Sequence, residues 1–385
     1  MSFRKRNVVI GTANNTSALP AAREGKSLAV GVRPSPLDGR LTTSTGTSSL
    51  DQLLAGHGGL PLGTSLLVQE AGTTDFGGTL LRYYAAEGLV QGHQVHVLGY
   101  GDTWRKELPG LETGKGKSKS SVQKGSTATD DKMKIAWRYE TLGNSSKRPG
   151  PAKESSPSSL PNLGEHPFCH SFDLTRRLES TEIKGQVHTT LVNDSFGKAT
   201  ASPLRKFLAE LSSKVQSMGP NTVHRVVCPG LLSPTLYTPS ARRPREVLQF
   251  IHGLRALLRR YPTQLTAIVT MPITLFARSA GLTRWLEVLF DGVFELVPLQ
   301  HQSQMALEPG KEDKSQGLLR VHSLPIFHEK GGGLEGSWVR EDLSFKLSAS
   351  SGLVITPYSL PPVGEEDEAS GAANTPDDKK EKLEF

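Results

Sequence analysis

The chain is poor in cysteine and has no long apolar segment. Only Cys169 and Cys228 occur among its 385 residues. These two fit neither a disulfide framework nor a paired-cysteine metal site, because both need closely organised sets of cysteines. No apolar run approaches the ~20 residues that cross a bilayer, and the basic start at Arg4-Lys5-Arg6 is followed by only a short apolar triplet. We therefore expect a protein of a reducing compartment, resident in cytoplasm and nucleus, with no signal peptide and no membrane anchor.

A strong excess of charge is also missing. Lys and Arg number 45 against 38 Asp and Glu, which gives a formal net charge of +7. Such a modest excess permits a nucleic-acid partner without requiring one. Hydrophobic residues make up 36% of the chain, so a fully disordered or fibrous protein is excluded.

Sustained apolar periodicity is absent from three stretches. Residues 1–40 form a basic, Ser/Thr-rich leader, residues from about 112 to 165 form a Lys/Ser/Gly/Pro-rich insertion, and residues 362–385 form an acidic tail. Such compositions cannot bury enough apolar surface to offset the entropy lost by ordering the backbone. We expect all three to be disordered, apart from one short ordered island at residues 133–139 of the insertion. One folded domain is expected over residues 41–361, and its folded character begins near Gly46.

The remaining sequence alternates between strand-like and helix-like segments. Apolar runs predict strands at 64–69, 94–98, 223–228, 265–271 and 293–297, and helical spacing predicts helices at 76–88, 203–218, 244–261 and 283–290. Repeated strand–helix alternation is typical of a mostly parallel sheet covered by helices on both faces. Three further strand-like runs, at 318–323, 343–347 and 353–355, predict an antiparallel C-terminal edge. The fold class is therefore α/β.

The most informative absence is that of one lysine. The segment Gly72-Thr73-Thr74-Asp75-Phe76-Gly77-Gly78-Thr79 lies between a predicted strand and a predicted helix, where a P-loop, G-x-x-x-x-G-K-S/T, would be found. The glycines and the final threonine are in register, but a glycine replaces the lysine that grips the β- and γ-phosphates, and an aspartate adds negative charge. Backbone N–H groups at a helix N-terminus can still meet an anion. The candidate nucleotide contacts of this degenerate loop are Gly72, Thr74, Gly77, Gly78 and Thr79; a plain strand-to-helix turn is the alternative.

A strand-end acid that would hold magnesium is absent as well. The neighbouring predicted strands end in Cys228-Pro229-Gly230 and in Thr270-Met271-Pro272, and neither end supplies a carboxylate. Two independent losses argue against nucleotide hydrolysis by this chain alone, so we expect no catalytic residue. A glutamate that activates water would have to be Glu70 or Glu87, and we expect Glu87, inside a helix, to lie on a solvated face.

Longer motifs carry a family resemblance. The segment from Thr45 to Thr64 resembles the T-G-x-x-x-L-D-x-L-L-x-G-G-hydrophobic-P-x-G approach to the P-loop in RecA-like ATPases. Three further segments narrow the match: the lysine-less loop GTTDFGGT, the stretch from His166 to Leu174, and the stretch from Arg225 to Pro234. Together they resemble the family of the fourth subunit of the Elongator complex, from Gly46 to about Pro361.

The resemblance implies a RecA-like fold that forms a heterohexameric ring with the fifth and sixth Elongator subunits. It further implies that the ring docks on the catalytic subcomplex, which modifies wobble uridines of tRNA, and that it binds tRNA in a nucleotide-sensitive manner. The family's loop is degenerate, as it is here, so no catalytic residue and no cofactor is carried over to this chain. ATP at the ring interfaces remains compatible with the resemblance.

Basic residues, histidines and tryptophans offer further candidates. The densest arginine group is Arg242, Arg243, Arg245, Arg259 and Arg260, and arginine contacts phosphate bidentately and stacks on bases. RNA contact competes here with a solvated helix face or a contact to a neighbouring subunit. His166 and His170 flank Cys169, but without a second ligand pair we expect no metal site. Tryptophans, including Trp104 and Trp285, are expected as core or interface anchors.

Two other functions remain open. One is an ATP hydrolase whose active sites are shared between the subunits of a ring, with this chain supplying Thr79 or an arginine in trans. The other is a RecA-type DNA-repair paralogue, which would prefer single-stranded DNA to tRNA and is disfavoured by the segment from His166 to Leu174.

Overall fold

The computed structural model describes residues 28–54, 58–112, 167–192, 202–299, 315–325, 343–348 and 352–358. The expected acidic tail, the expected insertion beyond residue 112, and residues 1–27 of the expected leader lie outside these ranges. His166 lies outside them too. Among the described residues, no helix is both long enough and apolar enough to cross a membrane.

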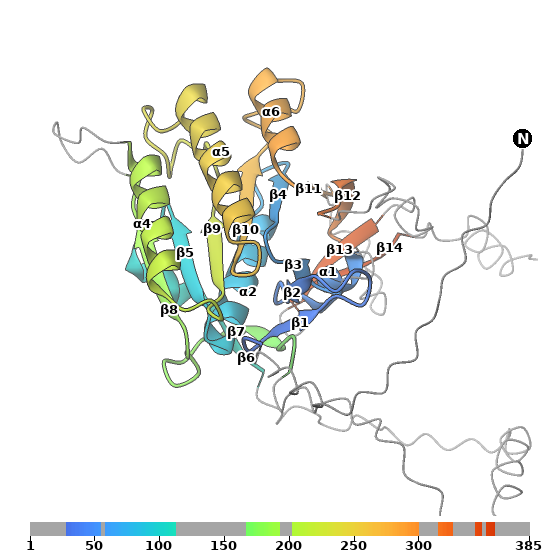
Figure 1. Ribbon diagram of the computed structural model, residues 1–385. Coiled ribbons are helices and arrows are strands. Elements are labelled where there is room, and N and C mark those ends of the chain that lie inside the picture. Colours follow the sequence, from blue (N-terminus) through green and yellow to red (C-terminus); the bar gives the residue numbers. More distant parts are fainter. Residues whose placement is uncertain are drawn as a thin grey trace, which may run out of the picture.

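Nine of the described strands form one sheet, in the order β14-β13-β12-β11-β4-β10-β9-β5-β8 (Figure 1). The parallel part comprises β4 (Ser65–Glu70), β5 (Gln94–Leu98), β8 (Gln186–Thr190), β9 (His224–Cys228), β10 (Leu265–Pro272) and β11 (Gly292–Pro298). The antiparallel edge comprises β12 (Gly317–Ser323), β13 (Leu343–Ser348) and β14 (Gly352–Pro357). The predicted α/β class, with its antiparallel C-terminal edge, is confirmed.

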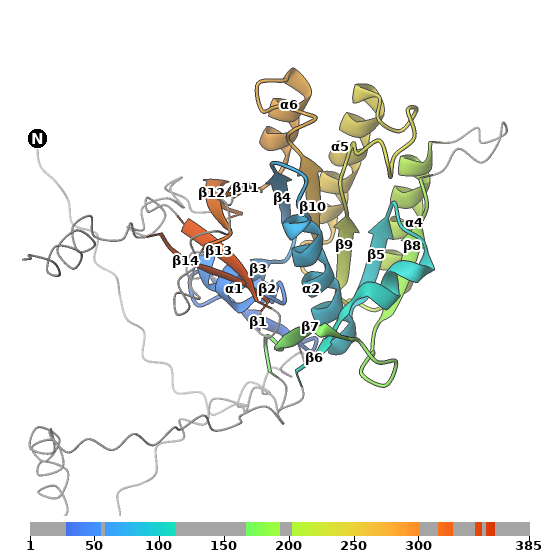
Figure 2. The same ribbon diagram turned by 180° about the vertical axis from the view of Figure 1, so that it is seen from behind.

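Helices cover both faces of the sheet, as predicted (Figures 1 and 2). On one face lies α2 (Phe76–Gln91), and on the other lie α4 (Pro203–Ser217), α5 (Pro244–Arg260) and α6 (Gly281–Leu289). Because side chains alternate along a strand, Leu66 and Val68 of β4 pack in the core on the α2 side while Leu67 packs on the other side. Both faces of the parallel strands are therefore buried, which explains their continuous apolar runs.

The N-terminal part of the domain adds a second, small sheet. Its strands are β1 (Val32–Pro34), β2 (Leu41–Thr43) and β3 (Leu60–Pro61), and α1 (Ser48–Leu53) follows β2. Strand β1 lies within the expected 1–40 leader, so ordered structure begins earlier than the sequence indicates. The reason is tertiary: Val32 is buried against Leu62 and Val223, and a three-residue strand carries no periodicity to detect.

A third sheet is a pair of short strands beside α2. It consists of β6 (Pro109–Leu111) and β7 (Phe172–Arg177), and the 3-10 helix η1 (Asp102–Glu107) precedes β6. The two strands pair antiparallel across the gap between residues 112 and 167. The described segments that flank the expected insertion are thus held side by side.

A buried arginine joins the small N-terminal sheet to the main one. Arg225 of β9 is completely buried, and each of its N–H groups reaches an acceptor. Nε donates to His93 Nδ1 (3.0 Å), Nη1 to the carbonyls of Ser44 (2.8 Å) and Tyr84 (3.0 Å), and Nη2 to Thr43 Oγ1 (2.7 Å) and Gln91 Oε1 (3.1 Å). Burial lowers the pKa of this guanidinium below its ordinary value. One cation therefore fixes β2, α2 and the start of β5 relative to β9.

Three histidines on and beside β5 and β9 are buried in the neutral state. His93 accepts a hydrogen bond from Arg225, and its Nε2 lies 2.8 Å from the Val30 carbonyl. His96 Nε2 and His224 Nδ1 are 3.0 Å apart and share one hydrogen bond. Burial lowers the pKa of His93 to about 3 and that of His224 to about 4, and burial with the neighbouring His224 lowers that of His96 well below its ordinary value.

These shifts predict loss of stability in mild acid. Because the three pKa values are depressed in the folded state, their contribution is present above the unfolded pKa of about 6.5 and is lost as the pH falls towards the folded values. If all three stay neutral in the fold, their contribution to the free energy of unfolding falls by up to about 4 kcal/mol per pH unit below pH ~6. Asp51, whose pKa burial raises, offsets part of this fall. Urea titrations at a series of pH values should show this slope.

The matched variants are His224→Gln and His252→Gln. The first removes a buried titratable ring and should make the slope shallower by about a third. The second changes an exposed histidine of α5 and should leave the slope unchanged. Equal slopes for the wild type and His224→Gln would contradict the assignment.

Candidate functional site

The turn from Gly72 to Thr79, called the 72–79 turn below, joins β4 to α2 at the edge where the parallel strands end. Ligand sites of open parallel sheets lie at this edge. The sequence predicts a strand, a glycine turn and a helix here, and the bounds of β4 and α2 confirm it. Gly72 adopts a left-handed φ of 86°, and its N–H donates to Thr274 Oγ1 at 2.8 Å.

The N-terminus of α2 already holds an anionic group. The Glu70 carboxylate, at the end of β4, accepts from the Phe76 N–H at 2.8 Å and the Thr74 hydroxyl at 2.8 Å through Oε1. Its Oε2 accepts from the Gly77 N–H at 3.1 Å. Glu70 is 8% exposed, and burial raises the pKa of its carboxyl while these three donors lower it. Sequence reasoning considered Glu70 only as a residue that activates water and missed this contact.

The other polar groups of the turn are also engaged. Thr79 is 5% exposed, and its hydroxyl donates to the Asp75 carbonyl at 3.0 Å and accepts from Arg82 Nη2 at 3.1 Å. Arg82 also forms an ion pair with the Asp75 carboxylate at 2.9 Å. A Cβ placed on Gly78 would lie 2.0 Å from Asp75 Oδ1. The Thr79 hydroxyl, a candidate nucleotide contact, is thus bonded within the protein.

A cavity of about 210 Å³ opens beside the turn. Its walls come from the turn, from Tyr100 and Trp104, from the connection after β9 and from the end of β10. The carboxylates that line it are Glu70 and Asp75; β9 and β10 end in Cys228 and Pro272. These residues do not fit a nucleoside triphosphate with its metal, because Glu70 takes the Phe76 and Gly77 N–H groups, no lysine lines the cavity, and neither β9 nor β10 ends in an acid.

The five candidate arginines do not form one site. Arg242 and Arg243 precede α5 and Arg245 lies in its first turn, whereas Arg259 and Arg260 are its last two residues. At 1.5 Å per residue the two groups are separated by about 24 Å along the helix. Arg242, Arg243 and Arg245 lie where the connection from β9 enters α5. This is the edge where the parallel strands end, on which the 72–79 turn also lies. Arg259 pairs with Asp291 at 2.8 Å, and Arg260 stacks over the Tyr261 ring.

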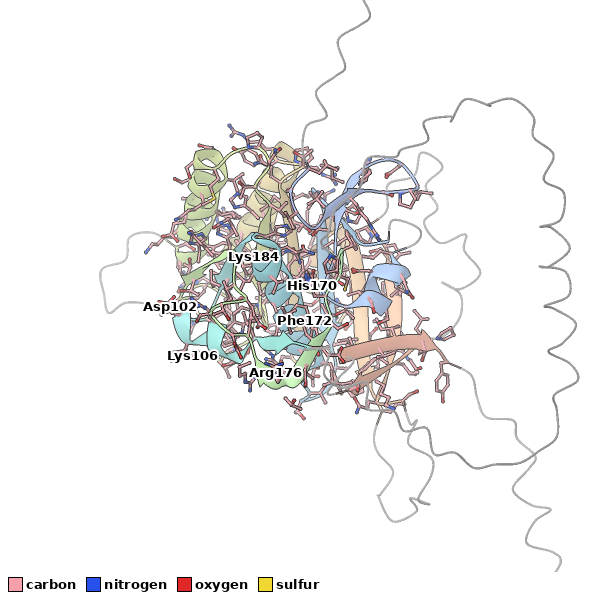
Figure 3. All side chains as sticks on the ribbon, turned by 90° about the horizontal axis from the view of Figure 1, so that it is seen from below. Asp102, Lys106, His170, Phe172, Arg176 and Lys184 are labelled. Carbon is pink, nitrogen blue, oxygen red and sulfur yellow. The ribbon has the colours of Figure 1, made fainter. Side chains whose placement is uncertain are left out.

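The expectation that Glu87 lies on a solvated face is wrong. It is completely buried, and its carboxylate accepts from the His170 N–H at 3.0 Å and contacts His170 Nδ1 at 2.9 Å and Gln91 Nε2. His170 lies beside Phe172 under α2 (Figure 3). His170 and Cys169 therefore hold the segment before β7 in place. Among the described residues, no group of three side chains is arranged to hold a metal.

The motif shared with RecA-like ATPases has a structural role in this chain. Asp51 of α1 accepts from the Ser44 hydroxyl (2.5 Å) and from the N–H (2.8 Å) and hydroxyl (2.7 Å) of Thr45. Burial raises the pKa of Asp51 to about 6 against these donors. Gly46 has a φ of 78°, and a Cβ there would lie 2.4 Å from the Tyr83 carbonyl. The T-G-x-x-x-L-D residues therefore close the turn before α1 and place Gly46 of that turn against α2.

Comparison with known proteins identifies the family. The family model described as PAXNEB protein matches residues 25–385. Elongator complex protein 4 of Schizosaccharomyces pombe is 32% identical over 363 residues, covering 91% of this chain and 93% of the relative. Elongator complex protein 4 of Saccharomyces cerevisiae is 30% identical over 339 residues, covering 78% and 70% of the two chains.

The chain belongs to this PAXNEB family. The predicted resemblance to the fourth Elongator subunit is thereby confirmed. The mostly parallel sheet with helices on both faces is the architecture that this resemblance implies. Among solved structures, a KaiC-like protein from Pyrococcus horikoshii OT3 is similar, with a TM-score of 0.39 and 14% identity over 82% of this chain and 99% of that chain.

The engaged hydroxyl of Thr79 generates a prediction about ATP turnover. Because that hydroxyl is bonded to the Asp75 carbonyl and to Arg82, Thr79→Ala should not change ATP turnover by an assembly that contains this chain. Gly78→Asp, which adds a second carboxylate beside Asp75, should not change it either. Steady-state ATPase assays on purified assemblies, with thermal unfolding to verify folding, give the result. A loss of turnover in a folded Thr79→Ala variant would show that this hydroxyl contacts bound metal and nucleotide.

Proposed function

We propose that this chain is a non-catalytic RecA-like subunit of the Elongator complex. In this proposal it forms a heterohexameric ring with the fifth and sixth subunits, and the ring docks on the catalytic subcomplex, binds tRNA and supports wobble-uridine modification. The chain itself uses no cofactor, and any ATPase activity belongs to the assembled ring. Residence in the cytoplasm and the nucleus is part of the same proposal.

The observation that carries the non-catalytic role is the Glu70 carboxylate on the Phe76 and Gly77 N–H groups. An ATPase of this fold needs those backbone groups for phosphate. The alternative, an ATP hydrolase with active sites shared in the ring, would require Thr79 or an arginine of this chain to act on a neighbour's nucleotide. The Thr79→Ala assay separates the two functions.

An exposed apolar surface on and before α6 supports a subunit role. Leu275 is 59% exposed, Trp285 61% and Val288 68%, and the last two are neighbours on α6 because they are three residues apart. Large apolar side chains that a lone chain leaves in water mark contact sites, and tryptophan is enriched among the residues that dominate binding. The expectation that Trp285 is an interface anchor fits this position.

Native mass spectrometry on the tagged chain, purified gently from its own cells, tests the assembly. We expect a hexamer-sized complex with two other RecA-like chains and bound tRNA. The double variant Trp285→Ser/Val288→Ser should lose most of these partners, while its thermal unfolding stays close to that of the wild type because both side chains are exposed. Leu37→Ser, at an exposed leucine between β1 and β2, is the matched control and should keep them. A lone wild-type chain that binds ATP would contradict the proposal.

The separation of the candidate arginines between the two ends of α5 allows a sharper test of tRNA binding. Replacing Arg242, Arg243 and Arg245 by alanine should weaken tRNA binding and lower the salt dependence of the affinity, by about one unit of slope for each phosphate that is no longer neutralised. The pair Arg259→Ala/Arg260→Ala removes charge at the opposite end of α5 and serves as the comparison. Fluorescence anisotropy of labelled tRNA over a range of salt concentrations measures both. Unchanged affinity and slope in the triple variant would remove these three arginines from the site.

A further inference from the structure

The sequence gives one reason why the 72–79 turn would not bind nucleotide, which is the missing lysine. The geometry points to a second reason. We propose that the Glu70 carboxylate is a built-in occupant of the phosphate position, and that it, more than the missing lysine, blocks the turn. This inference deepens the proposed non-catalytic function and rests on it.

The hydrogen bonds of Glu70 are those that a phosphate oxygen would make. A carboxylate at a helix N-terminus uses the first free N–H groups of the helix and its positive dipole end, as a phosphate does. Oε1 takes the Phe76 N–H and Oε2 takes the Gly77 N–H, the first two residues of α2. Each N–H has one proton to donate, and two anions cannot share the position because like charges at such distances repel strongly. An entering phosphate must first displace Glu70.

The packing around Glu70 holds the carboxylate in place. A Cβ on Gly77 would lie 2.9 Å from Glu70 Oε2 and 3.2 Å from Thr270 Cγ2, so the glycine that resembles a P-loop glycine makes room here for a carboxylate. The Thr74 hydroxyl supplies a third donor from within the turn. Glu70 also belongs to a strand with neighbours on both sides, β10 and β11, so its backbone does not follow the turn if the turn moves.

Restoring the lysine alone should not restore phosphate binding. A lysine at position 78 would first meet Asp75 Oδ1, but the Asp75 side chain is 70% exposed and can rotate into solvent. The substitution is therefore sterically tolerable, yet it leaves both N–H groups bonded to Glu70. Removing the Glu70 side chain frees these groups without adding a cation. The two changes thus test the two explanations separately.

The experiment measures binding of inorganic tripolyphosphate and of ATP to the full chain by isothermal titration calorimetry. We expect no measurable binding for the wild type and for Gly78→Lys, measurable binding for Glu70→Ala, and binding at least tenfold tighter for Glu70→Ala/Gly78→Lys. Asp75→Asn removes a carboxylate from the same cavity while leaving Glu70 in place, so it is the matched control and should behave as the wild type.

Glu70→Gln covers the case in which Glu70→Ala does not fold, because glutamine keeps the shape and one acceptor but carries no charge. It should bind tripolyphosphate more weakly than Glu70→Ala and more tightly than the wild type, with slower hydrogen exchange of the peptide containing Phe76 and Gly77 when tripolyphosphate is added. Folded Glu70→Ala and Glu70→Gln variants that bind no tripolyphosphate would overturn the proposal. Wild-type binding as tight as that of Glu70→Ala, or a gain from Gly78→Lys alone, would overturn it as well.

Partner recovery keeps this result distinct from the proposed function. Co-purification of Glu70→Ala with other RecA-like chains and tRNA reports on the assembly, whatever the calorimetry gives. A variant that assembles and binds no tripolyphosphate defeats the inference alone. Failure of the wild-type chain to assemble defeats the proposed function.

Discussion

The buried guanidinium of Arg225 is the group on which the rest of the domain depends. A cation removed from water is tolerated only when every one of its donors is satisfied, and deleting one partner of such a group costs several kcal/mol, roughly 3–5. Its acceptors come from β2, from α2 and from the residue before β5. No ordinary strand pairing would hold the small N-terminal sheet in place as specifically, because the small sheet has only short strands. His93, which accepts a hydrogen bond from the guanidinium, stays neutral because a second positive charge there would be costly.

Helix α2 is consequently held at both ends by charged side chains of other segments. Near its C-terminal end, the Tyr84 carbonyl and the Gln91 side chain accept from Arg225, and Glu87 accepts from His170. At its N-terminal end, the Glu70 carboxylate caps the first two N–H groups. The signs agree with the helix dipole at the start of α2, where an anion is favoured. The chain itself thus satisfies the first two N–H groups of α2, through the Glu70 carboxylate.

The main sheet and its helices were predictable because burial on both faces leaves a strong apolar pattern. The runs around Leu66 and Val226 indicated β4 and β9, and the spacing of Val247, Ile251 and Leu254 indicated α5. Strand β1 was not predicted because it is three residues long and is held by tertiary contacts. Glu87 was misplaced because a glutamate in a helix is usually exposed. The available signal was that α2 is apolar nearly all round, with Tyr83, Tyr84, Ala85 and Ala86 in succession, which is typical of a helix buried on every side.

The role of Glu70 could not be read from the sequence for a different reason. A motif search compares the residues of the loop with those of a P-loop, and Glu70 precedes the first glycine of that motif. Whether a strand-end carboxylate points into solvent or folds back onto the next helix depends on the path of the turn between them, which the sequence does not specify. The positions of the arginines could not be read from the sequence either. Arg245 and Arg259 belong to one helix, but the length of α5 places them at opposite ends of the strands.

The strand-end edge of this domain carries negative charge at its centre. The cavity beside the 72–79 turn is lined by two carboxylates, one of them bonded into the turn and the other paired with Arg82, so negative charge already occupies the place where an ATPase would receive phosphate. The groups exposed to a partner at this edge lie around it, with Arg243 and Arg245 at the start of α5 and Leu275 in the connection after β10. Charged and apolar groups thus lie around a cavity that two carboxylates line, an arrangement that offers contacts to other macromolecules.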